Sequence, residues 1–237
     1  MALIELIHVS KIYEIGGERV KALDDVSLKV EEGEFVAVTG ASGSGKTTLM
    51  NLIGALDRPD SGFCRFDGQD LGRLSDRALS RYRNREIGFI FQAFYLEESF
   101  TALENVMLPL LYAGIARPER EERARLALTR VGLGDRLRHR PCELSGGQRQ
   151  RVCIARALAG APRVILADEP TGNLDKEAGG SITELLRGLN RAGYTVILVT
   201  HDPAQAAHAK RRIEIERGRV IRDEKIVTEY LASQPPA

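Results

Sequence analysis

The strongest constraint in this sequence is the stretch Thr39–Leu56, "TGASGSGKTTLMNLIGAL", which places a glycine-rich loop between two ordered elements. An apolar run, "EFVAVTG" (34–40), predicts a strand before the loop, and a helical pattern begins near Lys46. Gly40 to Thr47 match G-x-x-x-x-G-K-[ST]. In such a loop, backbone N–H groups surround phosphate oxygens, and the helix N-terminus adds partial positive charge. The stretch therefore predicts a phosphate site within an α/β fold.

This loop suggests a role for each of its polar residues. Lys46 is placed to reach the β- and γ-phosphates of a nucleotide, and the Thr47 hydroxyl is placed to ligate Mg²⁺. The glycines allow backbone N–H groups to turn inward around the phosphate oxygens. A chance glycine-rich turn is the alternative, and the strand–loop–helix context disfavours it. The remaining residues expected to contact the nucleotide are Gly40, Ser42, Gly43, Ser44, Gly45 and Thr48.

Two acidic residues occur at the end of a second apolar run, "RVILAD" (163–168). Asp168 closes this expected strand, where a carboxylate can hold Mg²⁺ through water. Glu169 comes next, and a carboxylate beside a metal-bound triphosphate can orient and deprotonate the attacking water. A surface acid at a strand end is the alternative. Because the phosphate loop is present, we favour Asp168 as a metal ligand and Glu169 as the general base.

Further patterns along the chain indicate the fold class. Ile4–Tyr13 and Val20–Val30 are rich in β-branched residues and are joined through Gly16-Gly17, which predicts an antiparallel N-terminal sheet. Continuous apolar runs such as "IGFIFQ" (87–92) and "YTVILVTH" (194–201) are typical of parallel strands covered on both faces. Helical patterns dominate between the first of these runs and the run that ends in Asp168. We therefore expect an α/β fold with a mostly parallel core sheet, an N-terminal antiparallel β-subdomain and an inserted α-helical lobe.

The chain is expected to form one domain, because 237 residues fit one large domain or one domain with a lobe. We expect residues 1–92 and 160–237 to form the nucleotide-binding core with its β-subdomain, and residues 93–159 to form the helical lobe. Within the lobe, the stretch 117–130 mixes both charges, which favours a solvated helix face with i,i+4 pairs over a partner-binding patch. The final "SQPPA" (233–237) is expected to be disordered.

Composition narrows the classes of function. The net charge of +1 provides no electrostatic argument for binding nucleic acid or an anionic membrane. The three cysteines include no C-x-x-C pair, which disfavours a zinc site or disulfide framework and favours a reduced, cytosolic setting. The most apolar run, Val106–Ala116, is far shorter than the roughly 20 residues of a membrane helix, and the N-terminus lacks a signal-peptide pattern. We expect a soluble protein, so another chain would supply any membrane span.

A second glycine-bearing stretch, "ELSGGQRQRVCIARAL" (143–158), also precedes a helical pattern. Its segment "LSGGQ" (144–148) resembles the signature motif of ATP-binding cassette (ABC) ATPases, and its order relative to the other motifs is that of the family. The resemblance covers nearly the whole chain and implies ATP as the nucleotide. In the family this loop caps the γ-phosphate held by the phosphate loop of a second subunit, which implies a head-to-tail homodimer. The residues that would make this contact are Ser145, Gly146, Gly147 and Gln148.

Four further positions match smaller motifs of the family. Tyr13 matches the aromatic residue that stacks on adenine, and Gln92 matches the glutamine that meets Mg²⁺ or the attacking water. Asp175 in "GNLD" matches the loop that meets the partner across the dimer. His201 matches the histidine that contacts the γ-phosphate, and the resemblance implies that Lys46 and His201 assist the base in catalysis. An ordinary strand tyrosine and a structural histidine are the alternatives.

Several stretches resemble one branch of the family, which contains lipoprotein-releasing, macrolide-exporting and cell-division ATPases. They include "LMNLIGALDRPDSG" (49–62), "TALENVMLPLLYAGI" (101–115) and "ADEPTGNLD" (167–175). This branch implies an ATPase subunit, peripheral on the cytoplasmic face of the inner membrane, that drives a permease on a separate chain. A mechanical switch acting on a non-transporting membrane partner is the alternative. An ABC ATPase that acts on nucleic acid or ribosomes is a remote alternative, because no coiled coil, zinc insertion or second cassette is found in the sequence. No nucleic-acid partner is expected.

Overall fold

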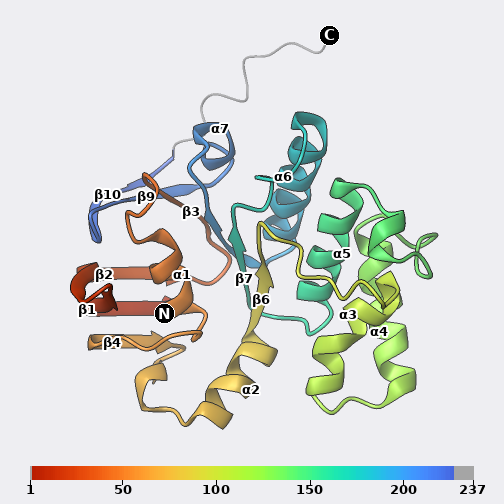
Figure 1. Ribbon diagram of the computed structural model, residues 1–237, viewed down its shortest axis with the longest axis horizontal. Coiled ribbons are helices and arrows are strands. Elements are labelled where there is room, and N and C mark those ends of the chain that lie inside the picture. The colour runs from red at the N-terminus through yellow and green to blue at the C-terminus, as the bar shows by residue number, and fades with distance from the viewer. Residues whose placement is uncertain (1, 227–237) are drawn as a thin grey trace.

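The computed structural model describes residues 2–226, and two β-sheets organise this part of the chain (Figure 1). An antiparallel sheet has the strand order β2-β1-β4-β5, and a larger sheet has the order β10-β9-β3-β8-β7-β6. The "SQPPA" segment lies outside the described residues. The strands are β1 (Ala2–Ile15), β2 (Glu18–Glu31), β3 (Phe35–Thr39), β4 (Ser61–Phe66), β5 (Gln69–Asp70), β6 (Ile87–Ile90), β7 (Val164–Asp168), β8 (Thr195–Val199), β9 (Arg211–Glu216) and β10 (Arg219–Lys225).

The N-terminal hairpin confirms the predicted antiparallel sheet. β1 pairs with β2 through a turn at Gly16 and Gly17, whose φ angles are +60° and +84°. Glycine adopts such positive angles readily because it has no Cβ, and this permits the tight reversal. The hairpin places Tyr13 near the far end of β1, where the strand approaches the turn.

Helices cover the sheets and occupy the segment between β6 and β7. Among the described residues this segment contains α3, α4 and α5 but no strand, as the sequence patterns indicate. α3 begins at a capping box on Thr101, and α4 carries the i,i+4 ion pairs Arg123–Glu119 and Arg125–Glu121. The helices are α1 (Lys46–Ile53), α2 (Asp76–Glu86), α3 (Ala102–Tyr112), α4 (Arg117–Arg130), α5 (Gly146–Leu158), α6 (Lys176–Arg191) and α7 (Pro203–Ala206).

Both faces of the larger sheet are buried along β3, β6, β7 and β8, because neighbouring residues on these strands enter different hydrophobic clusters. On β3, Val36 and Val38 pack in the cluster that contains α1, whereas Phe35 and Ala37 pack in the cluster that contains α5. β3 runs parallel to β8 and β9, the ladder continues in parallel through β7 to β6, and only β10 is antiparallel. The expected mostly parallel sheet is confirmed. α1 and α5 lie on opposite faces of it (Figure 1).

Across residues 2–226, every helix is too short or too polar to cross a bilayer.

Two pairs of strands were not predicted from the sequence. β4 and β5 complete the N-terminal sheet, and β9 and β10 form one edge of the larger sheet. In β9 the only local signal is the alternation of buried Ile213 and Ile215 with charged residues. Its pairing with β3 joins residues about 175 positions apart, such as Val38 and Ile213. The local alternation therefore does not indicate which strand β9 pairs with.

The cysteines provide a direct test of the packing. Cys64 and Cys153 are buried, whereas Cys142 is exposed. Burial raises the pKa of the Cys64 thiol to about 12 and that of Cys153 to about 11, so neither is a thiolate at neutral pH. We expect one thiol per native chain to react rapidly with a chromogenic disulfide reagent at pH 8, and all three after denaturation. Rapid reaction of Cys64 or Cys153 in the native protein, located by peptide mapping, would contradict this packing.

Candidate active site

The phosphate loop lies at the carboxyl end of β3, directly before α1. Gly43 and Gly45 have φ angles of +75° and +109°, and Gly45 is the residue that caps α1. A Cβ on Gly45 would approach the carbonyl oxygen of Ala22 to 2.5 Å. Because both backbone conformation and space exclude a larger side chain at this position, the glycine is required by the turn.

The interior of this loop fits a phosphate group. The Lys46 ammonium is buried and donates hydrogen bonds to the carbonyl oxygens of Gly40 at 2.7 Å and Ala41 at 2.8 Å. The buried Ser44 hydroxyl has no hydrogen-bond partner in the described part of the chain. An ammonium held only by neutral carbonyls and an unpaired hydroxyl are both suited to phosphate oxygens. The nucleotide contacts of Lys46 and of the other loop residues stay predictions.

The carboxylates predicted from the sequence lie at the end of β7, two strands from β3 in the sheet. Asp168 is half-buried, and burial raises the pKa of its carboxyl above the usual value. Glu169 raises that pKa further, whereas the positive charge of Lys46 lowers it. The carboxyl group is therefore close enough to the loop to interact with Lys46. The residues that would hold Mg²⁺ are Thr47, Asp168 and Gln92, and the ion would neutralise phosphate charge.

Glu169 is held tightly by the end of the neighbouring strand β8. Its Oε1 atom accepts a hydrogen bond from the His201 backbone N–H at 2.9 Å and lies 2.7 Å from Nδ1 of the same residue. Its Oε2 atom accepts from the Thr200 hydroxyl at 3.2 Å. The Glu169 backbone has a φ angle of +43°, a strained conformation that is common at functional sites. The structure thus joins the predicted base and the predicted histidine in one contact.

Gln92 lies just beyond β6 and is linked to the segment that follows Glu169. The Asn173 side chain donates to the Gln92 carbonyl oxygen at 2.9 Å, and the Gln92 side chain donates to Asn173 Oδ1 at 3.4 Å. The buried Gln150 of α5 donates to the carbonyl oxygens of Phe91 at 3.3 Å and Pro170 at 2.7 Å. Neither Asn173 nor Gln150 was among the predicted residues. Their partners are 81, 59 and 20 positions away, so no local pattern indicates these bonds.

Tyr13 lies beside the first turn of α1. Its hydroxyl donates a hydrogen bond to Asp57 Oδ2 at 2.9 Å. Burial and this bond raise the pKa of Tyr13, whereas the nearby Thr48 side chain lowers it. Thr48 lies in the first turn of α1, so the Tyr13 hydroxyl is near the helix that follows the phosphate loop. The base-binding role of Tyr13 stays a prediction.

The signature loop lies apart from these residues in a single chain. Ser145 caps α5, accepting from the Gln148 N–H at 3.3 Å, while Gln148 accepts from the Ser145 N–H at 3.0 Å. Gly146 and Gly147 pack against the segment after Glu169, where Asp175 caps α6. Within residues 2–226, no hydrogen bond joins the signature loop to the phosphate loop. The described part of the chain therefore has two separate glycine-rich loops, and the helices that begin at them pack on opposite faces of the sheet.

Comparisons with known proteins agree with this geometry. A model of the ABC transporter family matches residues 23–172. The chain belongs to the ABC transporter family. It is 51% identical over 222 residues to a macrolide export ATP-binding/permease protein, MacB 1, of Yersinia pestis bv. Antiqua (strain Antiqua). MacB of Burkholderia thailandensis is also 51% identical, over 221 residues. These matches cover 94% and 93% of the chain but 34% of each relative, so the chain spans about a third of their length.

Solved structures with the same fold are also ABC proteins. The dimeric structure of MJ0796, described as a bacterial ABC transporter cassette, has a TM-score of 0.86 and 45% identity, covering 94% of this chain and 99% of its own. A dimeric post-hydrolysis state of MJ0796 bound to ADP and Pi has the same TM-score at 44% identity, with the same coverage. CbiO1 from Clostridium perfringens has a TM-score of 0.85 at 27% identity, covering 95% and 89%. The chain is thus an ABC-type ATPase that binds ATP.

The hydrogen bonds around Glu169 suggest how this ABC ATPase would be impaired. If Glu169 is the general base, Glu169→Gln should lower turnover by roughly 10²–10⁴, the usual contribution of a positioned base. ATP binding should persist, because the substitution leaves the phosphate loop intact. Steady-state ATP hydrolysis and nucleotide binding measure the two effects, and Glu177→Gln on the exposed start of α6 is a matched control. Turnover at the wild-type rate in Glu169→Gln would remove Glu169 from this role.

Proposed function

We propose that two copies of this ABC ATPase bind two Mg-ATP head to tail, hydrolyse them, and drive a membrane permease of the export or extraction type. The observation that supports this most is the placement of two glycine-rich loops, whose helices pack on opposite faces of one sheet. Neither loop alone surrounds a triphosphate. In a head-to-tail pair, each phosphate loop would face the Ser145–Gln148 loop of the other copy, which completes two sites.

The catalytic roles proposed for this site follow from its hydrogen bonds. Glu169 would accept a proton from the attacking water, while Thr200 and His201 hold its carboxylate in place. Lys46 would exchange its two carbonyl partners for phosphate oxygens and stabilise the charge of the transition state. His201 would also reach the γ-phosphate. The backbone N–H groups of the phosphate loop would bind the remaining oxygens.

The relatives favour a partner in the membrane. MacB proteins are named as macrolide export ATP-binding/permease proteins, and MJ0796 is described as a transporter cassette. We infer that this chain occupies the cytoplasmic face of the inner membrane by binding a permease on a separate chain. The macrolide-exporting members of the branch suggest an amphiphilic export substrate.

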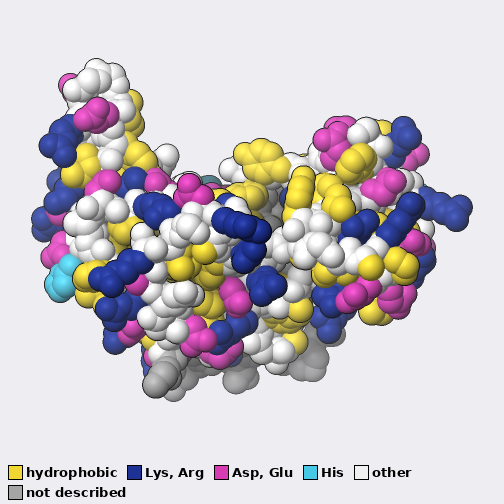
Figure 2. Space-filling model, turned by 90° about the horizontal axis from the view of Figure 1, so that it is seen from below, with side chains coloured by type: hydrophobic (Ala, Val, Ile, Leu, Met, Phe, Trp, Pro, Cys, Tyr) yellow, Lys and Arg dark blue, Asp and Glu magenta, His cyan; other side chains and the backbone are white. Residues whose placement is uncertain are grey.

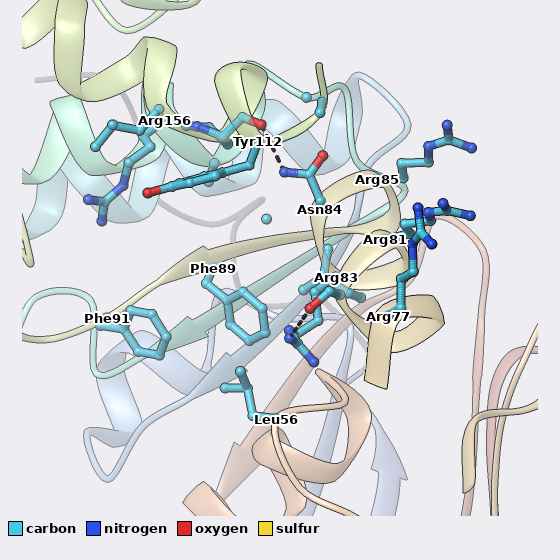
Figure 3. Close-up of a pocket in the computed structure, with 18 residues that line it drawn as sticks. Leu56, Arg77, Arg81, Arg83, Asn84, Arg85, Phe89, Phe91, Tyr112 and Arg156 are labelled. Atoms are coloured by element: carbon cyan, nitrogen blue, oxygen red, sulfur yellow. Dashed lines mark hydrogen bonds between the residues drawn. The ribbon is translucent and has the colours of Figure 1, made fainter. Parts of the chain in front are cut away.

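A groove between the core and the helical segment offers a docking surface for that permease. It has a volume of about 770 Å³ and is bounded by α2 and β6 on one side and by α3 and α5 on the other. Figure 3 shows Phe89 and Tyr112 on opposite walls of the groove. Tyr112 is 80% exposed, which is unusual for a large aromatic side chain unless it is covered in an assembly. An apolar segment of a partner would cover it.

The rim of the groove is basic. Arg77, Arg81 and Arg85 follow each other at four-residue intervals on α2, and Figure 3 shows them extending from the rim. Within residues 2–226 none of the three forms an ion pair. Figure 2 shows basic and hydrophobic side chains intermingled in the middle of one face of the molecule. Like charges at such spacing destabilise an isolated helix, so acidic groups on the docked permease segment would relieve their repulsion.

Substitution in the groove should separate docking from catalysis. Tyr112→Ala should leave the basal ATPase rate of the purified chain within about twofold and reduce co-purification of the permease at least about tenfold, as for a buried aromatic anchor. The measurement is quantitative mass spectrometry of complexes from detergent-solubilised membranes. Leu126→Ala, on exposed α4 and outside the groove, is the matched control. Unchanged permease recovery with Tyr112→Ala and with Arg81→Glu would place the docking surface elsewhere.

Head-to-tail assembly predicts a specific cross-link between copies. In a Glu169→Gln background with Cys64 and Cys153 replaced by alanine, Ser42→Cys adds a thiol to the exposed phosphate loop, and native Cys142 lies just before the signature loop. A short bifunctional thiol reagent should give a dimer band that is strong with ATP and weak without it. The same chain without Ser42→Cys controls for links between two Cys142 thiols. A link confined to the monomer band would show that the two loops meet within one chain.

A further inference from the structure

An ion pair between buried Lys11 and half-buried Asp57 supports the tyrosine of the proposed base site. Lys11 is buried, and its ammonium donates to Asp57 Oδ1 at 2.7 Å and to the Arg58 carbonyl oxygen at 2.8 Å. Asp57 Oδ1 also accepts from the Arg58 N–H at 2.7 Å. Burial alone would raise the pKa of Asp57, but the bonds from Lys11, the Arg58 backbone and Tyr13 outweigh it and hold that pKa below its usual value. The carboxylate is therefore charged at neutral pH.

Both members of this pair contact Tyr13. Residues 11 and 13 are two positions apart on β1, so their side chains extend from the same side of the strand. The Tyr13 hydroxyl donates to Asp57 Oδ2 at 2.9 Å, and the Lys11 ammonium lies 5.3 Å from the centre of the Tyr13 ring. One carboxylate thus holds the lysine with one oxygen and the tyrosine with the other. The ring has a cation on one side, within the range of a cation–π interaction.

The segment between α1 and β4, which contains Asp57, is hydrogen-bonded both to β1 and to α1. Asp57 follows α1, and its backbone N–H donates to the carbonyl oxygen of Asn51 within that helix at 3.3 Å. Asp60 Oδ2 accepts from the Ile12 N–H at 2.6 Å, and the Asp60 N–H donates to the Ser10 carbonyl oxygen at 2.9 Å. These hydrogen bonds fix the position of Tyr13 relative to α1, and so relative to the phosphate loop that precedes α1.

The ion pair is better explained by orientation than by stability. A partly buried ion pair contributes little net stability, because solvent weakens the attraction between the charges and the cost of removing them from water offsets the rest. Beyond Tyr13 the hairpin is open to solvent, and Ile15 is 62% exposed. Without its bonds to Asp57 and Lys11, the tyrosine ring would have several rotamers near the hairpin end.

We propose that Lys11 and Asp57 are positioning residues for the nucleotide base, which hold the Tyr13 ring with one face on the lysine and the other free for a purine. This inference rests on the proposed role of Tyr13 in binding adenine. Because the pair is neutral overall, it adds no net charge beside an uncharged base. A ring held in advance loses less conformational freedom when the base stacks on it, so the pair raises affinity for the base and leaves the chemical step unchanged.

The test is a double-mutant cycle on nucleotide affinity. Lys11→Met and Asp57→Asn should each weaken MgATP binding by about three- to tenfold, the range of a net hydrogen bond, with kcat unchanged. In a Tyr13→Ala background the same substitutions should change the Kd by less than about twofold, because their effect passes through the ring. Lys11→Arg, which keeps the charge, should retain most of the affinity. An equal loss with and without Tyr13 would overturn the proposal.

Two controls separate this inference from a loss of folding. Inorganic tripolyphosphate, which lacks a base, should bind the Lys11→Met and Asp57→Asn chains as it binds the wild type, whereas a distorted phosphate loop would weaken it too. Lys29→Met removes a similar charge from the exposed pair with Glu5 on the same hairpin and should leave the Kd for MgATP unchanged. A parallel loss of tripolyphosphate binding would make the pair structural.

The outcome for Tyr13 separates this inference from the proposed function. If Tyr13→Ala leaves MgATP affinity unchanged, the base-binding role fails and the inference fails with it. If Tyr13→Ala weakens binding while Lys11→Met and Asp57→Asn do not, only the inference fails. In that second case the ring binds the base without support from the pair.

Discussion

Burial of both faces of the parallel strands determines where the phosphate loop, the Asp168-Glu169 pair and His201 of this ABC ATPase lie. Parallel strands end at a common edge, so β3, β7 and β8 deliver the phosphate loop, Asp168-Glu169 and His201 to one place. Because residues alternate between faces, the helix after β3 and the helix before β7 cover opposite sides. The described chain therefore has one edge where the candidate catalytic groups meet, and the helices that begin at its two glycine-rich loops pack on opposite sides of the sheet.

Local sequence patterns predicted the groups whose position is set by their own strand or loop. The phosphate loop, the Asp168-Glu169 pair and the helix start at Ser145 each combine a periodic run with a polar terminus, and all lie where expected. The base-site pair of Lys11 and Asp57 was missed because its members are 46 positions apart. The same holds for Asn173, whose partner Gln92 is 81 positions away, and for the pairing of β9 with β3, which joins residues such as Val38 and Ile213.

The buried Gln150 explains how movement of the helical segment could reach the chemical edge. It belongs to α5, yet it bonds the carbonyl before Gln92 and the carbonyl after Glu169. A shift of α5 relative to the sheet would have to break these bonds or carry both segments with it. Gln92 is in turn bonded to Asn173, in the loop that leads to Asp175. A groove bounded by α3 and α5 is thus connected to the proposed metal and water ligands through a contiguous set of hydrogen bonds.

Charge explains why the proposed dimer would close only on a nucleotide. The start of α1 and the start of α5 both carry the partial positive charge of a helix N-terminus, and Lys46 adds a full charge beside the first. In a head-to-tail pair these ends face each other and repel unless an anion lies between them. The γ-phosphate satisfies both at once, whereas a cleaved phosphate can leave, which restores the repulsion. ATP binding at the two sites would therefore close the dimer, and hydrolysis would let it open. The same electrostatic contact between phosphate and helix ends would control both steps.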